Sequence, residues 1–476
     1  VVFLPRHAYY VYDNIICCIM FVDRSREQAW LRSHLTCDDR QLLVLYGRRR
    51  VGKTALVAHV FEDLSVPSVY FLCDQRGERP NARAFAERCA ELFDDVTPAV
   101  EGFRDAFRYL AGRVEGPAVV ALDEFSYLVD EDETIPSVFQ GIVDEVLDGT
   151  ELSLVLLGSS ISMMEEGVLS YESPLYGRRT GQWRLEPMTV GAAAEFFTQK
   201  TPHELIQLYS VVGGIPAYLE QFDADTDLAT NIERHVLSKG AFLYEEPEFL
   251  LRQELREPAT YMAILQAIAS GATRVSEIAG EIDRPASSLS RYLQNLTRLA
   301  LVERETPVTD PDGRGVYRLT DQYLRFWFRY VLPNRSSLEQ GATEPVRASI
   351  MDSLPTHVSW TFEDVCRQAV STPWFPVDCS RVGRWWYGED EIDVVGVDER
   401  TETLLLGECK WTAEPVSPSV LSSLEALEAE VRWRGDDRTV VYALFGKNGV
   451  HPDIETAANT RDDLFVFTPA DLLELW

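Results

Sequence analysis

The eight residues Gly47–Thr54 constrain the fold of this chain more than any other stretch of its sequence. They read GRRRVGKT and fit G-x-x-x-x-G-K-[ST], a pattern whose backbone N–H groups wrap phosphate oxygens. The apolar run Leu42–Tyr46 precedes the motif, and residues 55–61 follow it as an expected helix. An ordinary glycine-rich turn needs neither flank, whereas a phosphate loop needs both, because the helix N-terminus faces the negative charge. Further short strand-like runs are expected at residues 68–72, 118–122 and 153–157. The sequence therefore predicts a parallel α/β core that binds a nucleoside triphosphate.

The side chains of this loop have separate expected roles. The Lys53 ammonium would reach the β- and γ-phosphates, and the Thr54 hydroxyl would ligate Mg²⁺. The other positions would surround the phosphates with backbone groups: Gly47, Arg48, Arg49, Arg50, Val51 and Gly52. ATP and Mg²⁺ are therefore the expected cofactors.

A pair of acids follows the apolar run at residues 119–122. Asp123 would lie at the carboxyl end of a strand, beside the Mg²⁺, and Glu124 would orient or deprotonate the attacking water. The alternative is an aspartate that caps the following helix. Because a phosphate loop requires such a partner, catalysis is the favoured interpretation.

Two further candidates follow another apolar run, at residues 153–157. Ser159 would sense the γ-phosphate at the end of a strand. Arg178, one of two adjacent arginines in the next loop, would stabilise transferred charge as an arginine finger. A surface turn with salt bridges explains the two arginines equally well.

Several motifs occur together in one order: the box at residues 21–24 with Glu27, the phosphate loop, VVALDEF, LGSS, SPLYGRRTG and GGIPAYL. This set resembles the archaeal-type P-loop ATPases related to AAA+ and STAND proteins, over residues 21–335. The resemblance implies that the box at residues 21–24 and Pro216 lie near the adenine. It also implies that residues 186–255 form a helical lid.

Residues 256–335 look like a winged helix-turn-helix. Three amphipathic helices are expected at residues 261–269, 275–281 and 286–299, followed by a hairpin with its turn near residues 310–313. The third helix would expose side chains that can contact phosphates or base edges: Ser287, Ser288, Ser290, Arg291, Gln294 and Asn295. The segment holds 11 Arg and 9 acidic residues, a net charge of +2, and so is suited to contact DNA. A part of the nucleotide lid is the alternative.

The C-terminal region carries two carboxylates and a lysine in one constellation. Residues 391–398 and 403–410 look like the two strands of a hairpin with a four-residue loop. In that register Asp393 lies opposite Glu408, with Cβ atoms about 5 Å apart, and Lys410 shares their face. Such carboxylates can hold Mg²⁺ and polarise water against a phosphodiester. A solvated hairpin with a salt bridge is the alternative.

These residues resemble the D…(D/E)-x-K motif of restriction-endonuclease-like nucleases. Glu363, in a helical run, matches the acid of that family's first helix, whereas an isoleucine replaces the proline before Asp393. The resemblance implies an α/β fold in which Asp393 and Glu408 ligate a metal and Lys410 and Glu363 assist catalysis. Such domains are also retained only to bind, so the motif leaves cleavage open.

Amino-acid composition indicates the environment in which the protein works. The net charge is −31, and only 5 of the 45 basic residues are Lys, Lys53 and Lys410 among them. Both features are typical of a salt-adapted, haloarchaeal-type proteome, because dense carboxylates keep a protein hydrated when salt screens charge. No apolar run reaches the length of a membrane span and no C-x-x-C pair occurs. We therefore expect no membrane contact, zinc site or disulfide framework, and a reduced, cytoplasmic location.

The sequence thus predicts a multidomain α/β protein with five parts: an N-terminal extension at residues 1–20, a P-loop ATPase core at 21–185, a helical lid at 186–255, a winged helix at 256–335 and, after a polar linker at 334–343, a restriction-endonuclease-like domain at 344–476. The extension is expected to be an over-extended start before Met20, or else a strand or membrane-touching segment. The predicted function is an ATP-driven switch that couples nucleotide state to DNA contact and, if the carboxylates are active, to DNA cleavage. Two alternatives stay open: an ATP-regulated DNA-binding regulator with an inactive C-terminal domain, and a signalling or protein-remodelling ATPase without nucleic acid. None of these motifs specifies an oligomeric state.

Overall fold

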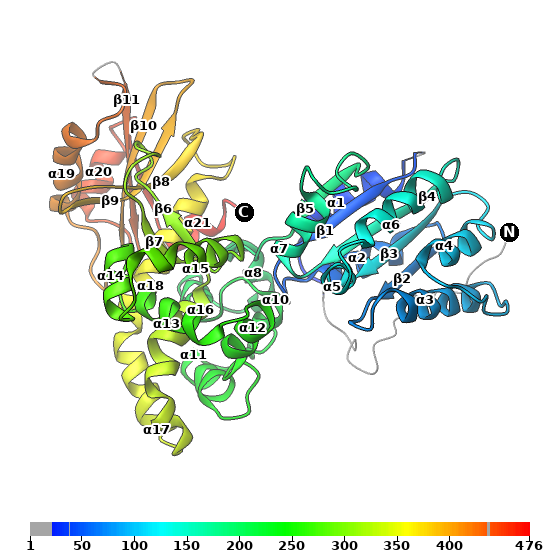
Figure 1. Ribbon diagram of the computed structural model, residues 1–476. Helices are drawn as coiled ribbons and strands as arrows, with labels where there is room; N and C mark the ends of the chain where they lie inside the picture. Colours follow the sequence, from blue (N-terminus) through cyan, green and yellow to red (C-terminus); the bar gives the residue numbers. More distant parts are fainter. Residues whose placement is uncertain (1–20, 38, 436–437) are drawn as a thin grey trace. The chain divides into compact units, whose positions relative to one another are not determined.

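The computed structural model describes residues 21–37, 39–435 and 438–476, so the predicted N-terminal extension lies outside the described residues. The chain divides into two compact units, Val1–Glu186 and Pro187–Trp476 (Figure 1). The first unit therefore ends one residue after the predicted end of the ATPase core.

The first unit is built on a five-stranded parallel sheet in the order β2-β3-β4-β1-β5. Its strands are β1 (Leu42–Tyr46), β2 (Ser68–Leu72), β3 (Ala118–Asp123), β4 (Leu152–Gly158) and β5 (Gly181–Arg184). Four of them are the predicted apolar runs, and β1 and β4 are buried along their whole length, as strands covered on both faces must be. The prediction missed β5, a partly exposed strand at the sheet edge whose sequence GQWR contains no apolar run. The parallel α/β core is confirmed.

Helices cover both faces of this sheet (Figure 1). They are α1 (Ser25–Leu35), α2 (Lys53–Asp63), α3 (Glu78–Leu92), α4 (Phe103–Ala111), α5 (Phe125–Glu131), α6 (Ile135–Gly141), η1 (Ile142–Val146), α7 (Ile161–Met163) and η2 (Met164–Leu169). Helix α4 buries Phe103, Ala106, Phe107 and Leu110, which recur at the spacing of one helix face. Phe103 and Phe107 both pack against Phe85 of α3. This apolar core packs against the sheet and fixes the positions of its strands, and the candidate functional residues lie at the carboxyl ends of those strands.

The second unit begins with short helices, as predicted for residues 186–255. They are α8 (Val190–Ala194), η3 (Glu195–Phe197), α9 (Pro202–Val212), α10 (Pro216–Leu219), α11 (Leu228–Asn231), η4 (Ile232–Leu237) and α12 (Glu246–Glu254). Between α9 and α10 the N–H of Met188 donates to the carbonyl of Gly214 at 2.7 Å. A Cβ on Gly214 would stand 1.9 Å from the Met188 carbonyl oxygen, so only glycine permits this close approach. The two glycines of the GGIPAYL motif thus lie between α9 and α10, where the backbone of Gly214 closely contacts that of Met188.

The helix-turn-helix consists of α13 (Pro258–Ala269), α14 (Val275–Glu281) and α15 (Ala286–Arg298), followed by the antiparallel hairpin β6 (Val302–Glu305) and β7 (Val316–Leu319). Each element begins and ends within three residues of its predicted position. Leu289, Leu293 and Leu296 bury one face of α15. The predicted winged helix-turn-helix arrangement of these elements is confirmed.

The loop of the hairpin, which we call the docked wing (residues 306–315), packs against the C-terminal sheet. The N–H of Val308 donates to the carbonyl of Arg384 at 2.9 Å, and the Val308 side chain belongs to the same apolar cluster as Trp385. The Arg384 guanidinium also pairs with Glu305 at 3.3 Å. A wing is therefore present, but its loop is committed to contacts within the second unit.

The chain between the hairpin and the C-terminal sheet is helical: α16 (Gln322–Phe326), η5 (Trp327–Val331), η6 (Leu332–Asn334), α17 (Arg335–Glu339) and α18 (Thr343–Val370). The polar linker expected at residues 334–343 is therefore wrong. Arg335 donates to Glu248 at 2.6 Å and to Glu245 at 3.0 Å. The segment at residues 334–343 is therefore polar in part because Arg335 forms ion pairs with Glu248 in α12 and with Glu245 just before it.

The C-terminal region is an α/β structure with the mixed sheet β12-β11-β10-β9-β8. Its strands are β8 (Arg381–Tyr387), β9 (Asp390–Asp398), β10 (Thr403–Lys410), β11 (Thr439–Gly446) and β12 (Leu464–Phe467); its later helices are α19 (Pro418–Leu427), η7 (Glu428–Glu430), α20 (Pro452–Ala458) and α21 (Pro469–Leu473). Leu404 and Leu406 of β10 share an apolar core with Leu424 of α19 and Ile454 of α20. In the parts of the chain that the structure describes, no helix is both long enough and apolar enough to cross a membrane.

Candidate functional site

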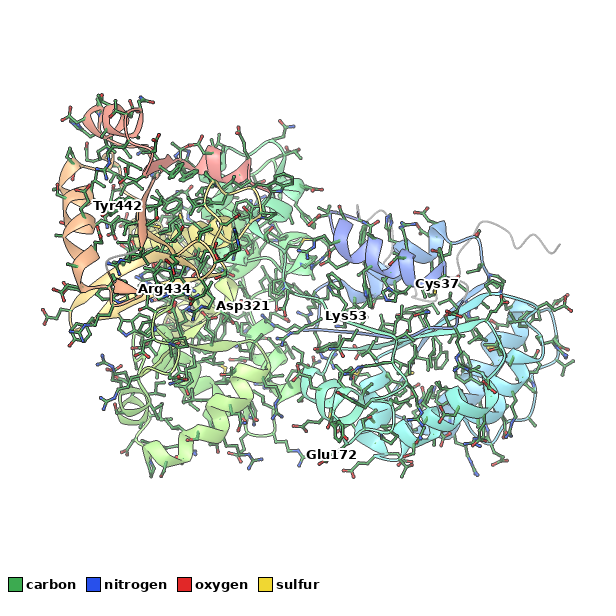
Figure 2. All side chains as sticks on the ribbon, turned by 90° about the horizontal axis from the view of Figure 1, so that it is seen from above. Cys37, Lys53, Glu172, Asp321, Arg434 and Tyr442 are labelled. Carbon is green, nitrogen blue, oxygen red and sulfur yellow. The ribbon has the colours of Figure 1, made fainter. Side chains whose placement is uncertain are left out.

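The phosphate loop joins β1 to α2, and Lys53, labelled in Figure 2, is the first residue of α2. Its buried ammonium donates to the carbonyl oxygens of Gly47 at 2.8 Å and Arg48 at 2.9 Å. Gly47 and Gly52 have φ values of 152° and 97°, and a Cβ on Gly47 would stand 2.4 Å from the carbonyl oxygen of Leu185. The loop is therefore a tight backbone turn with the ammonium folded into it.

Asp123 is a buried acid of the first unit whose two carboxylate oxygens both accept hydrogen bonds. It ends β3 and is 2% exposed. Its Oδ2 accepts the hydroxyl of Thr54 at 2.5 Å and the hydroxyl of Tyr70 at 2.5 Å, while Oδ1 accepts the N–H of Glu124 at 2.8 Å. The structure thus brings together the predicted pair Thr54 and Asp123, and it adds Tyr70, which the sequence analysis missed.

Glu124 stands directly after the strand with a φ of 52°, an uncommon value for a residue with a side chain. Its Oε1 accepts the hydroxyl of Ser159 at 2.6 Å. Its Oε2 is buried and accepts no hydrogen bond from any described residue. A buried carboxylate oxygen without a donor is costly, so this atom is ready for a proton-bearing ligand such as water. The predicted acid and the predicted sensor are therefore in direct contact.

The box at residues 21–24 lies against the phosphate loop. The Arg24 guanidinium donates to the carbonyls of Val51 at 3.2 Å and Glu186 at 2.8 Å and pairs with Glu27 at 3.2 Å. The Phe21 ring stacks on His59 of α2 with ring centroids 4.3 Å apart. The box thus braces the loop, whereas its place beside an adenine stays a prediction.

The predicted arginine finger, Arg178, is engaged in contacts of its own. The Arg178 guanidinium donates to Asp144 at 2.8 Å and to the carbonyl of Pro174 at 2.8 Å, so a role as an arginine finger would require this ion pair to break. Pro216 is the first residue of α10 and belongs to the second unit, so its place near the nucleotide stays a prediction. Within the loop, Arg49 donates to the hydroxyl of Tyr127 at 2.8 Å.

Asp393 and Glu408, with the nearby Glu363, form what we call the carboxylate cluster. It lies at the point where β9 and β10 stop pairing. The register is the predicted one, with Thr403 opposite Asp398, but the pairing stops one pair before Asp393 and Glu408. Beyond that point Asp393 Oδ2 accepts the N–H of Cys409 at 3.0 Å. A side-chain hydrogen bond thus replaces the backbone hydrogen bonds between the two strands.

Asp393 also lies near a third carboxyl group, that of Glu363 on α18. Burial, and then the charge of Asp393, raise the pKa of Glu363 to about 8 and the pKa of Glu408 to about 7. Burial also raises the pKa of Asp393. Burial lowers the pKa of Lys410, but its ammonium donates to Glu408 at 2.5 Å, and this contact makes the net shift upward. The structure therefore brings Glu363, Asp393, Glu408 and Lys410 together, and the charge of Asp393 opposes the ionisation of both glutamates.

A buried aspartate on α18, Asp364, ties this cluster to the winged-helix hairpin. It accepts hydrogen bonds from Arg318 of β7, from Arg325 at 3.1 Å and from Arg367 at 2.6 Å. Arg367 also donates to the carbonyl of Asp393 at 2.7 Å. Burial opposes the charge of Asp364, but the three guanidinium groups hold its pKa far below its ordinary value. No local pattern in the sequence indicated this network.

Metal binding at the cluster stays a prediction. Across residues 21–37, 39–435 and 438–476, no group of three or more His, Cys, Asp or Glu side chains is arranged to hold a metal ion. The predicted ligands there are only two, Asp393 and Glu408.

The exposed face of α15 is the candidate DNA surface. Ser287, Ser288, Ser290, Arg291 and Gln294 are exposed on it, as predicted. Asn295 is different: it is half-buried, and its amide donates to the hydroxyl of Tyr261 at 2.7 Å. The expected exposure of Asn295 was therefore wrong, because helix packing occupies that side chain.

Three parts of the chain match known protein families. Residues 21–222 match the family described as an ATPase domain predominantly from Archaea, and residues 261–306 match the IclR helix-turn-helix domain. Residues 327–433 match a family described as archaeal and bacterial proteins of unknown function. The nuclease resemblance stays a prediction, because that description names no activity.

Individual relatives extend the comparison. An uncharacterized protein of Methanocaldococcus jannaschii is 34% identical over 400 residues, which are 82% of this chain and 88% of that protein. An uncharacterized ATP-binding protein of the same organism is 36% identical over 55 residues, 12% of this chain and 93% of that protein. Among solved structures, a Walker-type ATPase of Pyrococcus abyssi has a TM-score of 0.50 at 22% identity and covers 65% of this chain and 96% of its own. The last likeness concerns the fold alone.

Proposed function

This chain belongs to a family of ATPases found predominantly in Archaea, and we propose that it binds and hydrolyses ATP to control its contact with DNA. One observation carries the ATPase half of the proposal: Thr54 of the phosphate loop is bonded to Asp123 at 2.5 Å, and the next residue, Glu124, has a buried oxygen without a donor among the described residues.

The residues fit ATP with Mg²⁺. At Gly47 a Cβ would stand 2.4 Å from the carbonyl oxygen of Leu185, so the tight turn of the loop requires glycine there, and Lys53 is held by carbonyl oxygens that phosphate oxygens could replace. Thr54 and Asp123 would hold Mg²⁺, which when bound would offset the charge of the phosphates. The positive end of α2 faces the same loop.

Glu124 would orient the attacking water and accept its proton. Ser159 occupies Oε1, so Oε2 is left for the water. Lys53 would move from the loop carbonyls to the β- and γ-phosphate oxygens and stabilise their charge. Movement of Ser159 between Glu124 and the γ-phosphate would let this side chain sense which nucleotide is bound.

The test is a pair of single substitutions assayed in high salt with Mg²⁺. Lys53→Ala should weaken ATP binding at least about tenfold, because the ammonium that would move to the phosphate oxygens is lost. Glu124→Gln should bind ATP within about twofold of the parent and turn it over about a hundredfold more slowly, since the general base is removed. Glu115→Gln, at an exposed position, is the control. Turnover by Glu124→Gln at the parent rate would refute the assignment of the base.

The DNA half of the proposal is supported by α15. Its exposed face presents hydroxyl, amide and guanidinium groups, and residues 256–335 have a net charge of +2 within a chain of net charge −31. Such a surface suits phosphate and base contacts. Because the docked wing packs on the C-terminal sheet, binding should be tested with the whole chain rather than an isolated winged helix.

A second candidate function is metal-dependent cleavage of a phosphodiester at the carboxylate cluster. The observation that favours it is the position of Asp393, Glu408 and Lys410 at the parting of two strands, with Glu363 near them. Asp393 and Glu408 would hold Mg²⁺ or Mn²⁺, which when bound would polarise water and the phosphate. Lys410 would position the water or offset phosphate charge, and Glu363 would hold a proton near Asp393.

Calorimetry with Mn²⁺, in nucleotide-free Lys53→Ala protein, tests the cluster separately from the ATPase site. Asp393→Ala should lose both Mn²⁺ binding and DNA cleavage, whereas Lys410→Ala should keep Mn²⁺ binding and lose cleavage. Asp390→Ala, at an exposed position of the same strand, is the matched control. If the parent binds Mn²⁺ no more tightly than Asp393→Ala, the cluster is a binding surface at most, and the regulator with an inactive domain is favoured. Absence of any DNA binding would favour the signalling or remodelling ATPase.

A further inference from the structure

We infer that Tyr70 is a positioning residue of the ATP-hydrolysing site: its hydroxyl holds Asp123 in place for Mg²⁺ beside Thr54. The inference rests on the proposed ATP hydrolysis. It adds a residue that belongs to neither the phosphate loop nor the acidic motif, because Tyr70 comes from a separate strand, β2.

Strand pairing explains how a tyrosine from β2 reaches this carboxylate. The parallel register pairs Tyr70 with Ala121 and Leu72 with Asp123. Ala121 and Asp123 are two residues apart on β3, so their side chains share one face of the sheet, and Tyr70 lies on that face beside its partner. The small methyl group of Ala121 leaves room for the phenol ring to lean toward the strand end. The hydroxyl then donates to Asp123 Oδ2 at 2.5 Å.

The hydrogen bonds of Asp123 show what this contact does. The N–H of Glu124 holds Oδ1, and the hydroxyls of Thr54 and Tyr70 hold Oδ2. Donors on both oxygens fix the plane of the carboxylate, which would otherwise turn about its side-chain bonds. Thr54 has a second task, since its oxygen is the expected metal ligand. The hydrogen bond from Tyr70 therefore keeps Asp123 in place without involving the phosphate loop.

The test is Tyr70→Phe, which removes one hydroxyl and keeps the ring. Without Mg²⁺, a fluorescent ATP analogue should bind the variant and the parent within about twofold. The Mg²⁺ concentration that gives half of the metal-dependent gain in affinity should rise roughly tenfold, the size expected for one hydrogen bond to a charged group. In hydrolysis assays kcat should fall at limiting Mg²⁺ and recover as Mg²⁺ is raised, with little change in KM for ATP.

The control is Tyr109→Phe in the same unit. The Tyr109 hydroxyl also donates to an aspartate, Asp95, at 3.1 Å, but at the exposed surface. If the Mg²⁺ dependence of Tyr70→Phe coincides with that of the parent, the inference is overturned. Equal loss of nucleotide affinity with and without Mg²⁺ would also overturn it, because Tyr70 would then only support the fold of the pocket. A parent that binds nucleotide without hydrolysing it counts against the proposed function, while Mg²⁺-dependent binding still decides the role of Tyr70. A parent that binds no nucleotide overturns both.

Discussion

At the scale of single residues, His357 of α18 is kept neutral by its surroundings. It packs edge-on against the rings of Phe326 and Tyr330, and its Nε2 lies 2.9 Å from the carbonyl oxygen of Ser210. Burial lowers the pKa of His357 to about 3. In the unfolded chain the same imidazole titrates at about 6.5. Between these two values the unfolded chain binds a proton that the folded chain does not.

This difference predicts that the contribution of His357 to stability falls as the pH falls below about 6.5. Between pH 7 and pH 5 the contribution of His357 to the free energy of unfolding should fall by about 2 kcal/mol. His357→Gln keeps an amide donor for Ser210 but does not titrate, so the variant should lose correspondingly less stability over this range. Urea unfolding followed by tryptophan fluorescence measures the second unit, because only Trp30 and Trp183 of the 10 tryptophans lie in the first.

The parent and His357→Gln are compared by the change in their free energy of unfolding between pH 7 and pH 5. The absolute free energy of unfolding is not used, because the substitution itself alters it. His451→Gln, at an exposed position, is the control and should follow the parent. Equal losses of stability in the parent and His357→Gln between pH 7 and pH 5 would show that His357 is protonated in the folded protein.

At the scale of elements, Asp364 joins α18 to α16 and to the hairpin strand β7. Asp364→Asn would leave the guanidinium groups of Arg318, Arg325 and Arg367 facing a neutral amide in a buried place. Removing one member of a buried charge network costs about 3–5 kcal/mol, so the free energy of unfolding of the second unit should fall by about that amount. Urea unfolding measures it, and Asp352→Asn, exposed on the same helix, should change it by less than about 0.5 kcal/mol.

Helix α15 should carry the salt-sensitive part of DNA binding. Each phosphate contact contributes about one unit to the slope of log affinity against log salt, so Arg291→Ala should weaken binding and reduce that slope by about 1. Fluorescence anisotropy with the whole chain over a salt series measures both quantities. Arg83→Ala, exposed in the first unit, removes the same charge and should leave the slope unchanged. If the two variants behave alike, net charge rather than α15 governs binding.

The sequence predicted those elements and contacts that depend on local pattern. Apolar runs located four strands, and the loop length located the register that brings Asp393 toward Glu408. Contacts made by tertiary packing were not predictable in this way. Tyr70 looks like any strand-forming aromatic residue, and Arg318 is one of 40 arginines whose spacing does not show which of them reaches a buried acid. Strand β5 was missed because an edge strand needs no apolar run.

At the scale of the whole molecule, ATP and DNA should influence each other's binding equally. If nucleotide state controls DNA contact, the factor by which ATP changes DNA affinity must equal the factor by which DNA changes ATP affinity. Glu124→Gln, which should bind ATP without turning it over, allows both affinities to be measured at equilibrium. We expect a factor of about 5 to 150, and a factor of one for Lys53→Ala. Two affinities that are independent of each other would rule out the switch.

The docked wing also bears on how this protein could be re-engineered. Val308 and Glu305 attach the hairpin to Arg384, so the helix-turn-helix segment and the C-terminal sheet share a packed surface and are not joined by a flexible linker alone. A chimera that grafts a foreign helix-turn-helix onto residues 258–319 would leave the edge strand β8 bare and would remove the Glu305 partner of the half-buried Arg384 guanidinium. Substitutions confined to the exposed face of α15 would keep the contacts of Val308 and Glu305 with Arg384 intact. New DNA preferences should therefore be introduced one helix face at a time.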